Sequence, residues 1–236
     1  MKRMKNVILI FLVACFLFWS CDSTDHGKLG GADITDTYYP TDAQFEERLQ
    51  FLCGVWYSYY AGEQLDGYRI RKWSDFAAED KAKAQILFPS LDVDNPKTYS
   101  TQEIPPNSYY VVLFDDNADG ESWGFGFMGL LRAINIFNGD KNRGALVIEY
   151  FEGADPLWLS DQGLTRGEKP FFGIYYRVLS QDSVQMANAV NLAAMYAGNP
   201  YYTEKGTLNE AIKTFNVENE AEFINWGVVT PFNRAK

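Results

Sequence analysis

The chain has 236 residues, a formal net charge of −10, and aromatic residues at 16% of its positions. This length is enough for one large hydrophobic core, so we expect a single domain. The acidic excess argues against nucleic acid and anionic lipid headgroups as partners. One histidine, His26, and three cysteines supply too few members for a Ser-His-Asp triad, a Cys-His pair or a His/Cys zinc site in the folded part. A binding role is therefore favoured over an enzymatic one.

The first 20 residues have the pattern of a secretory signal peptide. Three basic residues in MKRMKN precede VILIFLVACFLFW, an uncharged run of 13 residues. This run is shorter than the roughly 18–20 residues that span a bilayer. Cys21 follows it directly after a small residue, in FWSC, and the sequence then turns polar. Removal of residues 1–20 takes away three basic and no acidic side chains, which lowers the formal charge from −10 to −13.

The segment ending in Cys21 resembles the lipobox of bacterial lipoproteins, in which the cysteine is diacylated and becomes the new N-terminus. The resemblance implies lipidation of Cys21 and a lipid anchor in the cell envelope, at the outer membrane, the inner membrane or the cell surface. Cys15, in LVAC, is an alternative lipidation site, and a secreted protein with an unmodified Cys21 is a second alternative. If Cys21 is acylated and Cys15 removed, Cys53 is the only thiol left and no intrachain disulfide is expected.

Residues 21–40, rich in Asp, Thr and Gly, are expected to form a flexible tether, and residues 41–236 the folded domain. A helix should open the domain, because Thr41 and Gln44 have the spacing of a capping box and Phe45, Leu49 and Leu52 share one helical face.

Alternating apolar segments separated by turn signals then predict a series of strands. We expect strands at 54–61, 67–73, 98–104, 108–115, 121–128, 131–137, 145–152, 171–179 and 183–190. One helix is expected at 74–88, and a helical segment at about 190–226 follows the last strand. Sequential strands with short connections favour an antiparallel up-and-down β-barrel, which leaves no sheet edge open.

The short helix that leads into Gly54-Val55-Trp56 resembles the Gly-x-Trp signature of the lipocalin and wider calycin barrels. The resemblance implies a calycin-like barrel in which Trp56 closes the base and an arginine from the end of the barrel packs across it. Arg177 is our candidate for that arginine. The resemblance also implies a small apolar or amphipathic ligand inside the barrel, and runs such as WYSYY and IYYR offer aromatic side chains for its walls.

Residues 114–126, FDDNADGESWGFG, combine two motif-like patterns. Asp115, Asn117 and Asp119 match the first half of a calcium loop, but its twelfth position is Gly126 instead of a bidentate glutamate. We therefore favour a plain hairpin turn, with Ca²⁺ as the alternative and no other cofactor expected.

The glycines from Gly124 to Gly129 fit a dinucleotide fingerprint in spacing only, because a turn and not a strand precedes them. We expect these glycines to let a bent strand pass close to its neighbour instead.

Two functional hypotheses follow from these patterns. The first is a lipid-anchored envelope protein that binds a small apolar or amphipathic ligand in the barrel. The second is an envelope protein with a filled barrel that contacts a protein partner and takes no small-molecule ligand. The volume of apolar space inside the barrel separates the two.

Overall fold

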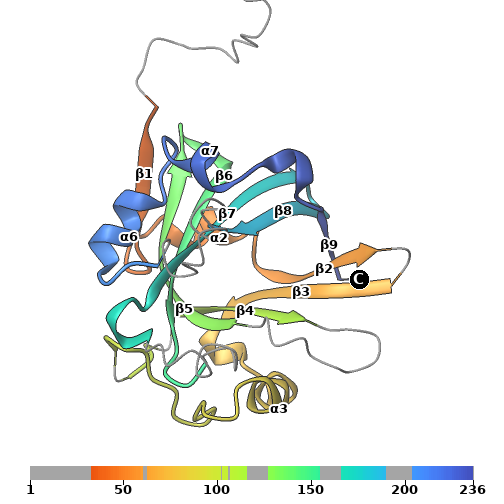
Figure 1. Ribbon diagram of the computed structural model, residues 1–236, viewed down its shortest axis with the longest axis vertical. Coiled ribbons are helices and arrows are strands. Elements are labelled where there is room, and N and C mark those ends of the chain that lie inside the picture. Colours follow the sequence, from red (N-terminus) through yellow and green to blue (C-terminus); the bar gives the residue numbers. More distant parts are fainter. Residues whose placement is uncertain are drawn as a thin grey trace, which may run out of the picture. The chain divides into compact units, whose positions relative to one another are not determined.

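The computed structural model describes residues 33–60, 63–101, 103–105, 107–115, 127–154, 166–189 and 204–235. The described part is mainly β, with short helices between and outside the strands (Figure 1). The strands are β1 Thr35–Tyr38, β2 Gly54–Tyr60, β3 Glu63–Lys72, β4 Tyr109–Asp115, β5 Phe127–Phe137, β6 Asp140–Tyr150, β7 Phe171–Ser180, β8 Ser183–Asn188 and β9 Phe232–Arg234. The α-helices are α2 Phe45–Leu49, α3 Ala78–Leu87, α6 Leu208–Thr214 and α7 Glu220–Phe223, and the 3₁₀ turns are η1 Trp73–Asp75, η2 Arg166–Glu168 and η3 Trp226–Val228.

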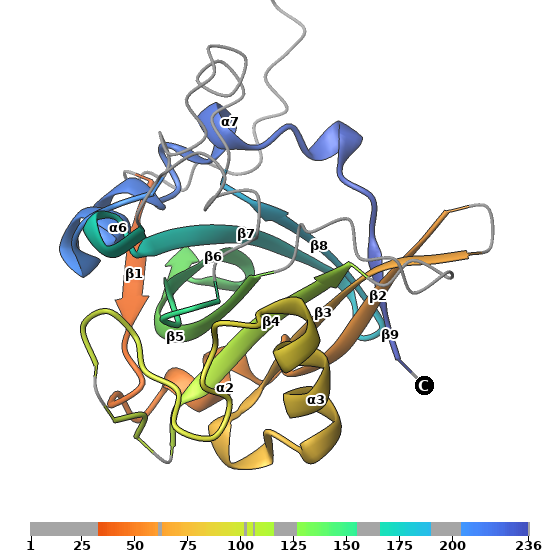
Figure 2. The same cartoon turned by 60° about the horizontal axis from the view of Figure 1, so that its bottom comes forward.

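Eight antiparallel strands, β2 to β9, close into a barrel in which each strand pairs with its neighbours in the chain (Figure 2). The last strand, β9, lies between β8 and β2 and completes the ring. β1 lies outside the ring and continues the sheet along β5, where Tyr38 pairs with Ile134. This order confirms the predicted antiparallel barrel, and closure pairs the edges that an open sheet would leave exposed.

Alternation along the strands divides the apolar side chains between the barrel interior and its outer face. The interior cluster combines residues of all eight barrel strands with Phe45, Leu49 and Leu52, which come from α2 and the turn after it. A second cluster lies outside, between the strands β4 and β5 and the segment of η1, α3 and the residues that follow. A third is formed by the outer faces of β5 to β7 with α6, α7 and η3. Figure 2 shows α3 and α6 on opposite sides of the ring.

Several predicted elements differ from the observed ones. The described residues of the predicted strand 98–104 form no strand, and a single bridge joins Thr98 to Phe151. The predicted strand 131–137 is the second part of the longer β5, and residues 121–126 lie outside the described part of the chain. β1 lies within the segment predicted as a tether, and β9 follows the predicted C-terminal helices. β1 and β9 are short strands that become regular only by pairing with strands distant in sequence.

The close-packing role predicted for the glycines holds at Gly129. A Cβ atom there would lie 2.5 Å from the Ile148 side chain and 2.6 Å from the Glu149 carbonyl oxygen. Such contacts are much shorter than van der Waals distances, so the β5–β6 pairing at this point requires glycine.

A capping box of Thr207 and Glu210 opens α6 with both reciprocal hydrogen bonds. None of the helices in the described ranges is long and apolar enough to cross a membrane.

Candidate functional site

Trp56 is the third residue of β2 and lies in the barrel interior. Its side chain is fully buried in the interior cluster, next to the apolar residues of α2. The indole Nε1 donates a hydrogen bond of 2.8 Å to the Leu52 carbonyl oxygen, so the polar atom of this large side chain is satisfied in the core. The ring therefore joins the segment after α2 to the first strand of the barrel.

Arg234, from β9, lies over the Trp56 ring. Its guanidinium lies 4.1 Å from the centre of the Trp56 ring, within the range of a cation–π contact. Its two terminal nitrogens donate to the carbonyl oxygens of Cys53, at 2.8 Å, and Phe51, at 2.9 Å. Nε donates to the Gln181 carbonyl in the β7–β8 turn, at 3.3 Å. One side chain thus ties together the start of β2, the last strand and a turn of the barrel.

The glycine of the Gly-x-Trp motif has a physical role at this point. Gly54 has a φ of 135°, a backbone conformation that residues with a side chain rarely adopt. A Cβ atom on it would also lie 2.7 Å from the Arg234 Nη1 atom. Both the turn into β2 and the approach of the arginine therefore require glycine.

The arginine over Trp56 is Arg234 and not Arg177, so our prediction for Arg177 is wrong. Arg177 lies on β7, where its guanidinium is 4.4 Å from the Trp226 ring. The prediction failed because β9 is three residues long and follows a helical segment. The available sequence signal was an arginine close to the end of the chain, after the last helix.

The barrel interior contains a connected series of aromatic rings, which we call the aromatic group: Phe232, Tyr68, Phe127, Phe172 and Tyr150. Tyr68 is the cross-strand partner of Trp56. Successive ring centres lie 4.9, 6.1, 4.7 and 4.1 Å apart. These side chains come from five different strands. They retain only 3–7% exposure, so all five rings are buried.

The two tyrosines of the aromatic group carry hydroxyls with defined partners. Tyr68 Oη donates to Asn188 Oδ1 at 3.3 Å, and Tyr150 Oη donates to Glu204 Oε1 at 3.0 Å. Apolar ring faces with a few oriented polar atoms suit an apolar or amphipathic molecule.

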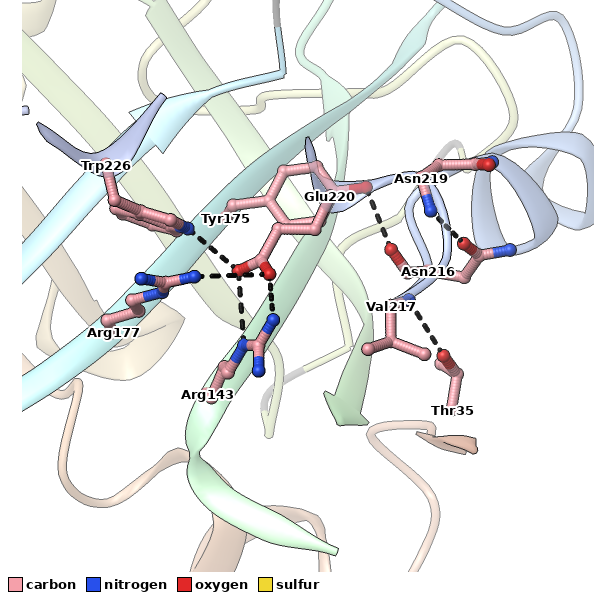
Figure 3. A network of polar contacts seen from close by, with 9 residues as sticks. All are labelled: Thr35, Arg143, Tyr175, Arg177, Asn216, Val217, Asn219, Glu220 and Trp226. Carbon is pink, nitrogen blue, oxygen red and sulfur yellow. Dashed lines mark hydrogen bonds and ion pairs between the residues drawn. The ribbon is translucent and has the colours of Figure 1, made fainter. Parts of the chain in front are cut away.

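A polar network holds the C-terminal segment against the outer wall (Figure 3). Its centre is Glu220, in α7, which is only 3% exposed. The carboxylate accepts hydrogen bonds from Arg143 and from Arg177, the latter at 3.3 Å, and from Trp226 Nε1 at 2.9 Å. Burial alone would raise the pKa of Glu220, but the hydrogen bonds and charges of these partners outweigh it and hold the pKa below its usual range.

The free thiol of Cys53 does not have the environment of a nucleophile. It lines a groove of about 570 Å³ beside α2, together with Glu46, Lys72 and Tyr109. Burial, assisted by the negative charge of Glu46, raises the pKa of the Cys53 thiol to about 12. The thiol is therefore protonated at neutral pH and weakly reactive.

The predicted cation loop falls largely outside the described residues. Asp115 is the last residue of β4, and Asn117 and Asp119 lie in the range that the structure does not describe. Within the described ranges, no group of three or more Asp, Glu, His or Cys side chains could hold a metal ion. Cys21 and Cys15 also lie outside these ranges.

The chain was compared with protein-family models, with curated proteins and with solved structures, and none of them matches it.

Proposed function

We propose that this protein is a lipid-anchored envelope protein with a calycin-type barrel that binds a small apolar or amphipathic ligand. The observation that carries the proposal is the packing of Trp56 under Arg234 and next to α2, which we interpret as the closed end of a calycin-type barrel. A barrel closed in this way can admit a ligand only from the opposite end. The aromatic group, whose Tyr68 pairs directly with Trp56, would supply apolar ring faces and two hydroxyls to such a ligand.

Ligand binding can be tested with a fluorescent fatty-acid analogue. Leu113, at the end of β4, is partly buried against the interior cluster. A Leu113→Trp substitution should fill part of the space beside the aromatic group and weaken binding about tenfold or more, a loss typical of a blocked pocket. The matched control is Leu179→Trp, at a residue 53% exposed near the end of β7, which should bind like the parent. Equal affinity in all three proteins would place the ligand outside the barrel.

The second candidate function is binding of a protein partner. In this case side chains fill the barrel interior, and the protein takes no small-molecule ligand. The close stacking of Tyr150 on Phe172, with ring centres 4.1 Å apart, favours it, because stacked rings leave no room between them. Absence of saturable binding of the analogue by the parent protein would select this second candidate.

The lipid anchor is a separate part of the proposal and rests on the sequence around Cys21. A diacylated cysteine contributes about 0.8 kcal/mol for each buried methylene, so its loss should release the protein from membranes or leave it unprocessed. Metabolic labelling with a fatty acid should therefore label the parent and Cys15→Ser, but not Cys21→Ser. Label retained in Cys21→Ser and lost in Cys15→Ser would assign lipidation to Cys15 instead.

A further inference from the structure

A groove of about 620 Å³ lies on the outer surface, where β5 passes between the segment after β1 and the segment before β4. Its walls are mostly apolar and include Pro40, Pro105, Leu130, Leu131 and Leu208. Its volume is in the range of small-molecule sites, which are largely apolar with a few placed polar groups. No Asp or Glu is among the described residues that line it.

The charged residue of the groove is Arg132, which occupies an irregular position in β5. Leu131 pairs with Ile148 and Ala133 with Val147, so Arg132 has no partner in the β6 register. Such a bulge turns one side chain away from the regular alternation, and bulges are frequent beside functional sites. It places a guanidinium in a segment whose only other polar residue is Asn135, LLRAINIF.

A fully buried carboxylate fixes the orientation of Arg132. Glu149 is completely buried on β6, and one of its oxygens accepts a hydrogen bond from the Arg132 Nη1 atom. The same carboxylate accepts from the Ser100 backbone nitrogen at 2.7 Å and from the Ser100 hydroxyl at 2.9 Å. Burying an ion pair is costly unless its geometry is well satisfied, and here each carboxylate oxygen has a donor.

The guanidinium has donors left for a ligand. Its bonds to Glu149, Ser100 and Thr101 all use Nη1. Nη2 and Nε have no hydrogen-bond partner within the described ranges, and the side chain retains 25% exposure where it lines the groove. A planar guanidinium with a free edge is suited to hold a carboxylate through two parallel hydrogen bonds.

We propose that this groove is a binding site for a small amphipathic carboxylate, with Arg132 holding the acid group and the leucine and proline walls contacting the apolar part. Glu149 acts as a positioning residue, because it binds the Nη1 atom of Arg132 and leaves Nη2 and Nε to the ligand. The site lies outside the barrel and does not depend on whether the barrel interior takes a ligand.

Calorimetric titration with octanoate tests the site, with octanol as the uncharged analogue. The parent should bind octanoate about tenfold more tightly than octanol, because a charge-assisted pair is lost in the alcohol. The double substitution Arg132→Gln/Glu149→Gln removes both charges together and so avoids leaving a buried carboxylate without its partner. It should lower octanoate affinity to the level of octanol.

A second variant keeps the buried pair intact. Leu208→Glu places a carboxylate in the groove and should weaken octanoate binding about tenfold by like-charge repulsion. Leu179→Glu, on an exposed part of β7, is its matched control and should bind like the parent.

The Leu113→Trp variant tests whether octanoate binds in the groove or in the barrel interior. It should bind octanoate with the affinity of the parent. A loss of octanoate binding in this variant would assign the carboxylate to the interior. Unchanged octanoate binding in Leu208→Glu, or a parent that does not discriminate octanoate from octanol, would overturn the proposal.

Discussion

Replacing Trp56 with alanine is expected to lower the free energy of unfolding by roughly 3–5 kcal/mol, the usual cost of truncating a buried aromatic side chain. Trp56 has no exposed surface, and its loss removes the ring over which Arg234 lies and the hydrogen bond to Leu52. Against a total stability of about 5–15 kcal/mol, this is a large fraction. Urea denaturation of the parent and the variant measures the difference.

Two further variants separate the contributions of the Trp56 ring and the Arg234 guanidinium to stability. Trp56→Phe keeps a ring under the guanidinium and should cost less than alanine. Arg234→Lys keeps the charge but cannot bond to the Phe51 and Cys53 carbonyls with the same planar fork. A double-mutant cycle of Trp56→Phe and Arg234→Lys should show coupling of about 0.5–2 kcal/mol, since the two side chains are in contact.

Tyr59→Ala, at a residue that is 47% exposed on the same strand, is the control and should change stability by about 0.5 kcal/mol or less. A Trp56→Ala protein that unfolds at the parent's urea midpoint would show that the indole does not hold this end of the barrel closed. The calycin-type interpretation would then lose its main support.

The sequence predicted most of the barrel strands because they are long and clearly patterned. β2, β4, β7 and β8 fall within two residues of their expected ranges, where apolar residues alternate or run between turn signals, whereas β6 begins five residues earlier than expected. β9 has only three residues, Phe-Asn-Arg, and no periodicity can be read from so short a segment. It is a strand because it pairs with β2 and β8, and such pairing is determined by the tertiary fold.

The candidate sites were less predictable than the fold, since each depends on contacts between distant segments. Trp56 was found from a local motif, but its partner Arg234 is separated from it by the whole barrel. Arg132 and Glu149 face each other because β5 and β6 form a hairpin with a bulge, and periodicity does not reveal a bulge. The charged Arg132 within an apolar run was the available signal.

The second large effect is expected at Glu220, which joins α7 to the barrel wall. Glu220→Ala should cost about 2–4 kcal/mol, because it leaves Arg143, Arg177 and the Trp226 indole without their shared acceptor. We place the value below that of a fully buried pair, since both arginine side chains are about a third exposed and partly screened by water. Glu218→Gln, at an exposed position on the same segment, is the control and should leave stability unchanged.

The pH dependence gives a second readout for the same carboxylate. The pKa of Glu220 is lower in the folded protein than its ordinary value of 4.5. A depressed pKa means that the folded state favours the charged form, so the stabilisation is present above about pH 4.5 and is lost as the pH falls through the lower folded value. Glu220→Gln should remove this part of the acid sensitivity, and melts of both proteins from pH 7 down to about pH 3 measure it. A parent and a Glu220→Gln protein that lose stability in parallel would show that the network does not respond to acid.

Loss of the Glu220 network should also destabilise β9, a strand of the barrel. The segment from α6 to η3 packs on the outer faces of β5 to β7 and leads directly into β9, which has only two paired residues with β2 and two with β8. A strand with so few pairings depends on the anchoring of the chain before it. Amide hydrogen exchange in Glu220→Ala should therefore speed up at β9 and at the facing residues of β2 and β8, while β5 and β6 keep their protection. Protection lost only within α7 would show that β9 is held by its own pairings and by Arg234, independently of the helical segment.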